Sequence, residues 1–176
     1  MNFPTSFWLG LALLSGTLTK VMGTEAASKL LVVNGWNEDQ KAPTELLDLE
    51  NPSESCLLPD FPDDLIWSTG GYTGDGAIIC GGRNPHTWSA TNQCYQLENG
   101  EFVQTDTNMT RPRSLAGSVI TTNEELWILG GYNQGGPLEI CELYGSVRTT
   151  DDLSGPIYGH CVAKINATTA IGKHYF

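Results

Sequence analysis

The stretch LWILGGYN, residues 126 to 133, places four apolar residues before a glycine doublet and an aromatic residue. A near copy, AIICGGRN, occupies residues 77 to 84, and a more divergent copy, LLVVNGWN, occupies residues 30 to 37. Gly35, Gly82 and Gly131 follow one another at spacings of 47 and 49 residues. Four consecutive apolar residues suit a strand buried on both faces, and glycine permits a tight turn where a Cβ atom would clash. The chain therefore repeats a unit of one buried strand and one glycine turn.

Further strand-like runs occur at regular distances from these turns. After them come TELLDLEN (44–51), QCYQLENG (93–100) and EICELYGS (139–146). Before the second and third turns come the inner runs IWSTGGYTG (66–74) and LAGSVITTN (115–123), and the pattern begins again at GHCVAKINATTAIG (159–172). A period near 48 residues with several short strands is typical of a β-propeller. One four-stranded antiparallel blade cannot bury both of its faces alone, so neighbouring blades must stack.

Composition agrees with an all-β fold and excludes some functions. The chain has 176 residues, enough for one domain, with 20 Gly and 9 Pro to make frequent turns. No long helical stripe of apolar residues is present, so we expect few helices. The net charge is −11 with only nine Lys and Arg. That balance argues against binding nucleic acid or an anionic membrane surface.

The N-terminus predicts secretion. FWLGLALLSG (7–16) is an apolar run too short to span a bilayer, and cleavage is expected after Gly23, which makes residues 1–23 a signal peptide. A buried strand or an N-terminal anchor is the alternative. No second apolar stretch predicts membrane insertion. Asn108 and Asn166 begin glycosylation sequons, which fits an extracellular protein.

The repeated residues resemble the Kelch-repeat family of β-propellers. The resemblance rests on the turns at 80–82 and 129–131, on Tyr95, on Phe102 where the family usually has tryptophan, and on MTRPRSLAGSVI (109–120). The segment 56–62 is similar to secreted, cysteine-containing Kelch proteins of invertebrates. The first unit departs from the pattern, with Asn34-Gly35 in place of the glycine doublet.

The resemblance implies a partial propeller. Residues 24–65 are predicted to form strands two to four of a first blade, residues 66–107 a second blade and residues 108–153 a third. Residues 154–176 are predicted to hold the inner strand and truncated start of a fourth. Closed rings have about four to eight blades. We therefore expect an open arc that forms homo-oligomers or pairs with another Kelch chain.

No catalytic, cofactor or metal site is predicted. The three histidines, His86, His160 and His174, form no paired metal-binding motif, and neither a nucleophile elbow nor a phosphate-binding glycine loop occurs. The prediction is a secreted, non-enzymatic module that binds a protein or the extracellular matrix. Two alternatives stay open: an inactive truncated relative of a galactose-oxidase-like copper enzyme, or an incomplete product with no independent function.

The predicted binding residues are aromatic or polar residues at turns. Exposed aromatic residues gathered at one rim would form a binding surface, and the alternative is that they cap blade edges. Trp67 and Trp127 lie in strand-like runs and are predicted to be core residues. The rim set comprises Trp36, Tyr72, Trp88, Tyr132 and Asn133, beside the repeated turn glycines Gly35, Gly81, Gly82, Gly130 and Gly131.

The repeat register also predicts a disulfide. Cys80 ends one strand of the second unit, and Cys94 begins the next. An antiparallel pairing of these strands would bring the two residues within bonding reach. The equivalent position to Cys80 in the third unit is Leu129, although Cys141 matches Cys94. Partners for Cys56, Cys141 and Cys161 do not follow from the sequence.

Overall fold

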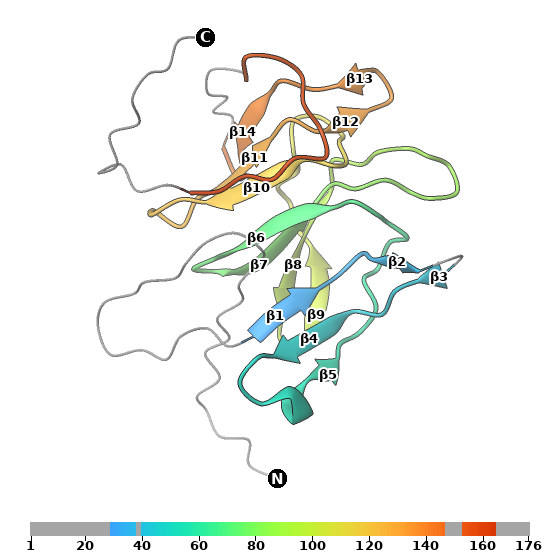
Figure 1. The fold of residues 1–176 in the computed structure, drawn as a ribbon, viewed down its shortest axis with the longest axis vertical. Helices are drawn as coiled ribbons and strands as arrows, with labels where there is room; N and C mark the ends of the chain where they lie inside the picture. Colours follow the sequence, from blue (N-terminus) through green and yellow to red (C-terminus); the bar gives the residue numbers. More distant parts are fainter. Residues whose placement is uncertain (1–28, 38–39, 147–152, 165–176) are drawn as a thin grey trace.

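The chain folds into a stack of small antiparallel β-sheets. The computed structural model describes residues 29–37, 40–146 and 153–164 (Figure 1). Within these residues the only helical element is the 3-10 turn η1 (Pro52–Glu54), and every strand pair is antiparallel. The all-β prediction is therefore confirmed. The described sheets do not close into a ring, so the propeller stays a prediction.

Three sheets and two short hairpins make up the described fold. The first sheet contains β1 (Lys29–Val32), β4 (Glu45–Asp48) and β5 (Cys56–Leu57). The middle sheet contains β6 (Thr69–Thr73), β7 (Gly76–Cys80), β8 (Cys94–Glu98) and β9 (Glu101–Gln104). The third sheet contains β10 (Gly117–Ile120), β11 (Leu126–Leu129) and β14 (Cys141–Leu143). The hairpins are β2 (Trp36–Asn37) with β3 (Gln40–Lys41), and β12 (Tyr132–Asn133) with β13 (Gly136–Pro137).

The middle sheet is buried on both faces, which explains its run of apolar residues. Ile79 packs with Leu31 and Leu46 of the first sheet. Its neighbour Ile78 points to the opposite face and packs with Leu126 and Ile128 of the third sheet. Successive side chains of a strand alternate between faces, so only a continuous apolar run fills two cores at once. The predicted burial of this strand on both faces is confirmed.

The glycine doublets let one sheet approach the next closely. Gly81 and Gly82 have φ values of 63° and 110°, and Gly130 and Gly131 repeat them at 59° and 104°. A Cβ atom on Gly81 would lie 2.5 Å from the carbonyl oxygen of Arg113, and one on Gly130 would lie 2.5 Å from that of Ile157. Both the left-handed backbone and the contact distance require glycine here. In the first unit Asn34 takes the left-handed position, with φ 57°.

A second set of left-handed residues links successive units in series. Trp67, Leu115 and Gly159 have φ values of 59°, 55° and 63°. The amide of Leu115 donates to the carbonyl oxygen of Trp67 at 3.0 Å, and the amide of Gly159 donates to that of Leu115 at 2.8 Å. We call these three residues the left-handed ladder. It places residue 67 and its equivalents side by side at one position of the stack.

The predicted disulfide is present. Cys80 and Cys94 face each other in the β7–β8 register, with their Cα atoms 4.1 Å apart, and their sulfur atoms are bonded. Cys56 and Cys161 are exposed, and Cys141 is buried in the third sheet. A disulfide is compatible with an extracellular protein. No helix among the residues described is long and apolar enough to cross a membrane.

Candidate functional site

The candidate site consists of an arginine and four aromatic residues that contact it or one another. The guanidinium carbon of Arg83 lies 5.1 Å from the ring centre of Tyr132 and 5.9 Å from that of Trp88. Trp88 contacts Trp67, with ring centres 6.0 Å apart, and Tyr132 contacts Tyr158 edge-on at 5.2 Å. We call Trp67, Arg83, Trp88, Tyr132 and Tyr158 the Arg83 surface. Its members come from four separate stretches of the chain.

The repeat explains why these stretches meet. Arg83 follows the doublet of the second unit, and Tyr132 follows the doublet of the third. Each forms the same type of isolated antiparallel bridge, Arg83 with Ile66 and Tyr132 with Ser114. Figure 1 shows the β2–β3 hairpin, the β7–β8 loop and the β12–β13 hairpin on the same side of the three sheets. Equivalent positions of successive units therefore become neighbours on one surface.

Three of the aromatic side chains are open to solvent. Trp67 is 42% exposed, Trp88 is 55% exposed and Tyr158 is 51% exposed. Ile157, beside Tyr158 in the chain, is also exposed. Single exposed apolar residues are normal on a protein surface, but several exposed apolar residues that lie together are typical of an interaction site.

Both exposed tryptophans also have a backbone conformation that bulky residues rarely adopt. The φ values are 59° for Trp67 and 58° for Trp88, in the left-handed region. For a bulky side chain this region is sterically unfavourable, and such residues are concentrated at functional sites. The fold thus holds two large rings toward solvent at a cost in backbone strain. A residue with a core role would instead be buried.

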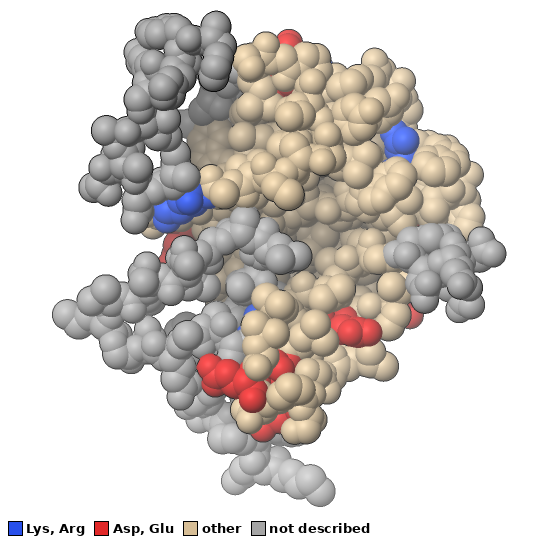
Figure 2. Space-filling view, in the orientation of Figure 1, with Lys and Arg blue, Asp and Glu red and all other residues tan. Residues whose placement is uncertain are grey.

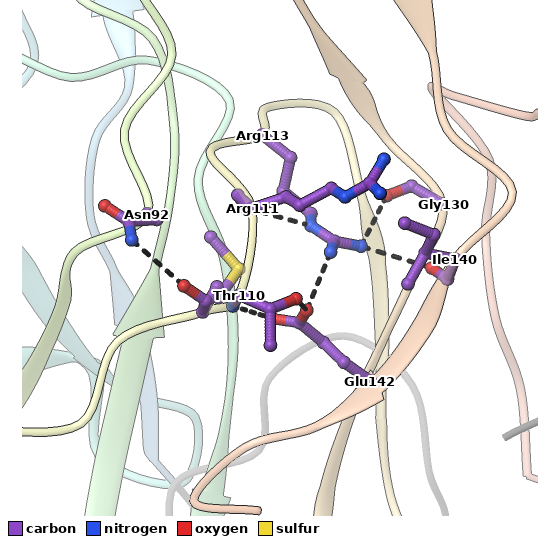
Figure 3. Close-up of polar contacts among 8 residues, drawn as sticks. Asn92, Thr110, Arg111, Arg113, Gly130, Ile140 and Glu142 are labelled. Carbon is purple, nitrogen blue, oxygen red and sulfur yellow. Dashed lines mark hydrogen bonds and ion pairs between the residues drawn. The ribbon is translucent and has the colours of Figure 1, made fainter. Parts of the chain in front are cut away.

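A buried polar cluster fixes the turn that carries Tyr132 (Figure 3). Arg113 is almost completely buried and donates to Glu142 Oε2 at 2.8 Å and to the carbonyl oxygens of Gly130 and Ile140 at 3.0 and 3.2 Å. Glu142 also accepts hydrogen bonds from the amide and the hydroxyl group of Thr110. Burial lowers the pKa of Arg113 from its ordinary value. The guanidinium group that pairs with Glu142 also donates to the carbonyl oxygen of Gly130. The ion pair therefore stabilises the glycine turn two residues before Tyr132.

The structure brings together two of the five predicted rim residues, Trp88 and Tyr132. Trp36 lies in β2, at the position equivalent to Arg83 and Tyr132. Asn133 is half-buried, and its Oδ1 atom accepts the amide of Gly135 at 2.8 Å, so it stabilises the local turn. Tyr72 lies in β6 and packs against the core between the first and middle sheets. Tyr72 is therefore not part of the Arg83 surface.

Three members of the Arg83 surface were not predicted as site residues. Trp67 was expected in the core and is exposed instead, because its left-handed backbone turns it out of the inner strand. Arg83 and Tyr158 were not singled out. The repeat alignment could have identified Arg83, since it aligns with Trp36 and Tyr132 directly after the glycine turns. No sequence pattern marks Tyr158, because neither a glycine doublet nor an apolar run precedes it.

The remaining predicted positions are the glycosylation sequons and the histidines. Asn108 is exposed, as a glycosylation acceptor must be, and Asn166 lies outside the described residues. Among residues 29–37, 40–146 and 153–164, no three His, Cys, Asp or Glu side chains gather as metal ligands would. His160 is half-buried against Gly117 and Gly130, and burial lowers its pKa from the ordinary value.

Comparison with known proteins adds little. No family model matches the chain, and no curated protein matches it. Among solved structures, one titled "Structure of YjhT" is similar at 18% identity, with a TM-score of 0.45. The match covers 61% of this chain and 37% of that chain, so it spans well under half of the matched protein.

Proposed function

We propose that the chain is a secreted, non-enzymatic binding module built as part of a Kelch-type β-propeller. In this proposal the three sheets are consecutive blades, and the left-handed ladder marks equivalent positions at the start of the second, third and fourth blades. The repeated φ values of the glycine doublets and the repeated bridges at Arg83 and Tyr132 support this arrangement. The Cys80–Cys94 disulfide supports an extracellular location.

One observation carries the binding function: the exposed aromatic rings gathered around Arg83. Tryptophan, tyrosine and arginine are the residue types that contribute most to binding energy at protein interfaces. Here four aromatic residues and an arginine form one set of ring contacts. We therefore propose that the Arg83 surface binds an extracellular protein or matrix component.

A matched pair of variants tests this proposal. The double variant Trp88→Ala with Tyr158→Ala removes two exposed rings, one in contact with Arg83 and one in contact with Tyr132. The control Leu49→Ala with Val103→Ala removes exposed apolar side chains that lie after β4 and in β9, outside the Arg83 surface. The tagged full chain and both variants are incubated with extracellular fluid, and bound proteins are quantified by mass spectrometry.

We expect one set of proteins bound equally by the natural chain and the control, and reduced about tenfold or more by the aromatic double variant. Equal capture by all three proteins would contradict the proposal. Capture of nothing above an untagged background would contradict it equally. A cooperative thermal unfolding transition in each variant, followed by far-ultraviolet circular dichroism, confirms that the comparison is between folded proteins.

A further inference from the structure

The guanidinium group of Arg83 has no hydrogen-bond acceptor among the described residues. Its Nε atom is buried without a partner, and the side chain forms neither an ion pair within 4.0 Å nor a hydrogen bond with any described residue. A guanidinium group carries five N–H donors. Burying donors without acceptors costs free energy, and a charged donor costs more than a neutral one. The two Nη groups are not among the buried atoms, so they are the donors open to an acceptor that the described part of the chain does not supply.

Arg113 shows how the same protein treats an arginine with a structural role. That side chain has a carboxylate partner, Glu142, and two backbone carbonyl partners. Arg83, half-buried at the surface, has ring contacts in place of them. The contrast separates an arginine that holds the fold from one that is available to a ligand.

The rings leave the donors of Arg83 available. Cation–π contact with Trp88 and Tyr132 stabilises the charge over the ring faces, and neither contact consumes an N–H group. The planar fork of a guanidinium group matches the two oxygens of a carboxylate, and such bidentate hydrogen bonds are among the strongest in proteins. A partner that covered the surrounding rings would exclude water from that pair, which would strengthen it further.

The shape and charge of the surface favour a protein as the source of the carboxylate. One hollow of the described surface is lined by residues 137–140 with Arg111 and Pro156, and another lies between β7 and β14; the Arg83 surface lines neither. Small ligands prefer concave sites, whereas an open patch of exposed rings suits a macromolecule. In Figure 2 the largest group of acidic side chains on the visible face lies over the first sheet, and smaller acidic patches lie elsewhere, one of them at the top edge. No carboxylate of the described residues lies within 4.0 Å of the nitrogen atoms of Arg83.

We propose that Arg83 binds an aspartate or glutamate side chain of a protein partner, while Trp67, Trp88 and Tyr158 cover an apolar residue beside it. This inference rests on the proposed binding function and adds the chemistry that the partner must present. The overall charge of −11 opposes an acidic partner at long range, but salt screens that repulsion beyond about 8 Å at physiological ionic strength. Recognition therefore depends on the local contact with Arg83.

The test uses defined probes with the full chain. The capped peptide acetyl-Leu-Glu-Leu-amide is titrated while the side-chain Nε–Hε resonance of Arg83 and the tryptophan indole resonances are followed by NMR. The glutamine peptide acetyl-Leu-Gln-Leu-amide is the uncharged control, and glucuronate tests an acidic sugar as the carboxylate source. The variants are Arg83→Gln, which removes the charge, and Arg83→Lys, which keeps the charge without the fork.

We expect the glutamate peptide to shift the Arg83 resonance and to bind about tenfold more tightly than the glutamine peptide. Arg83→Gln should abolish that preference, and Arg83→Lys should retain only part of it. Equal binding of the two peptides would overturn the inference, as would tighter binding of glucuronate than of the glutamate peptide. If the two peptides bind the natural chain equally and both perturb its indole resonances, the aromatic binding function stands and only the carboxylate assignment fails.

Discussion

Arg113 and Glu142 form a buried ion pair that holds the third sheet to the loop before it. Removing one partner of such a pair leaves an uncompensated charge in the interior, which typically costs about 3–5 kcal/mol. Arg113→Met and Glu142→Leu should each lower the free energy of unfolding by an amount in this range. The double variant should lose less than the sum of the two, because no lone charge remains. Urea unfolding of the three variants measures this coupling.

Arg111→Met is the matched control for Arg113→Met, since Arg111 is exposed and lies two residues away. It should change the unfolding free energy by less than about 0.5 kcal/mol. Strict additivity of the two core substitutions would show that Arg113 and Glu142 are not coupled.

His160 makes the last described segment sensitive to acid. Both ring nitrogens are buried without a hydrogen-bond partner among the described residues, and burial lowers the pKa of the imidazole. A lowered folded-state pKa means that the unfolded chain takes up the proton first. The stabilisation is therefore complete above the unfolded pKa of about 6.5 and is lost as the pH falls below it. Thermal unfolding at about pH 7.5 and pH 5 measures the loss.

His160→Phe should reduce this acid-dependent fall in the melting temperature, because phenylalanine cannot take up a proton. His86→Gln, which changes an exposed histidine in the β7–β8 loop, should leave the fall unchanged. The same pH dependence in His160→Phe and in the natural chain would refute the role of His160.

At the scale of single elements, the repeat predicts that a disulfide equivalent to Cys80–Cys94 can be introduced into the third sheet. Leu129 and Cys141 are register partners in β11 and β14, as Cys80 and Cys94 are in β7 and β8. Leu129→Cys should therefore form a disulfide with Cys141, contributing roughly 3 kcal/mol by the loop-entropy model. Peptide mapping under non-reducing conditions identifies the bond. In the control Leu129→Cys with Cys141→Ser the new cysteine should remain a thiol, and a free thiol in both variants would show that the two sheets differ in geometry.

Elements with a repeated pattern were predictable from the sequence, and single contacts between units were not. The apolar runs and glycine turns specified β7 and β11, and their register located the Cys80–Cys94 bond. Trp67 was assigned to the core because its neighbours resemble an inner strand, and only its left-handed backbone reveals the exposed ring. Tyr72 was assigned to the rim because it was expected in or beside a turn, although it lies in strand β6 and is partly buried against the core shared with the first sheet. Contacts across units, such as Arg83 with Tyr132, depend on how the sheets stack, which no local pattern encodes.

At the scale of the whole molecule, the outer face of the first sheet should promote self-association. Leu31 and Leu46 point into the core, so the alternate residues Leu30, Val32 and Leu47 lie on the opposite face. Val32 is exposed, and so is Leu57 on the neighbouring strand β5. A sheet face of this kind drives association when no other element packs on it. Sedimentation velocity should show concentration-dependent oligomers.

The variant Val32→Lys with Leu57→Lys should shift the chain toward monomer, since two like charges would then repel across the contact. Trp88→Ala, on the Arg83 surface, should leave the oligomeric state unchanged. A natural chain that stays monomeric at high concentration would contradict this prediction.

The central claim is that partner binding takes place on the Arg83 surface, and hydrogen–deuterium exchange tests it most directly. Exchange is measured on the full chain alone and in complex with the proteins that it captures from extracellular fluid. We predict that binding slows exchange in residues 83–90 and 156–159, which flank the aromatic rings, and leaves β9 unchanged. Slowed exchange confined to the first sheet, with no change in residues 83–90, would contradict the account.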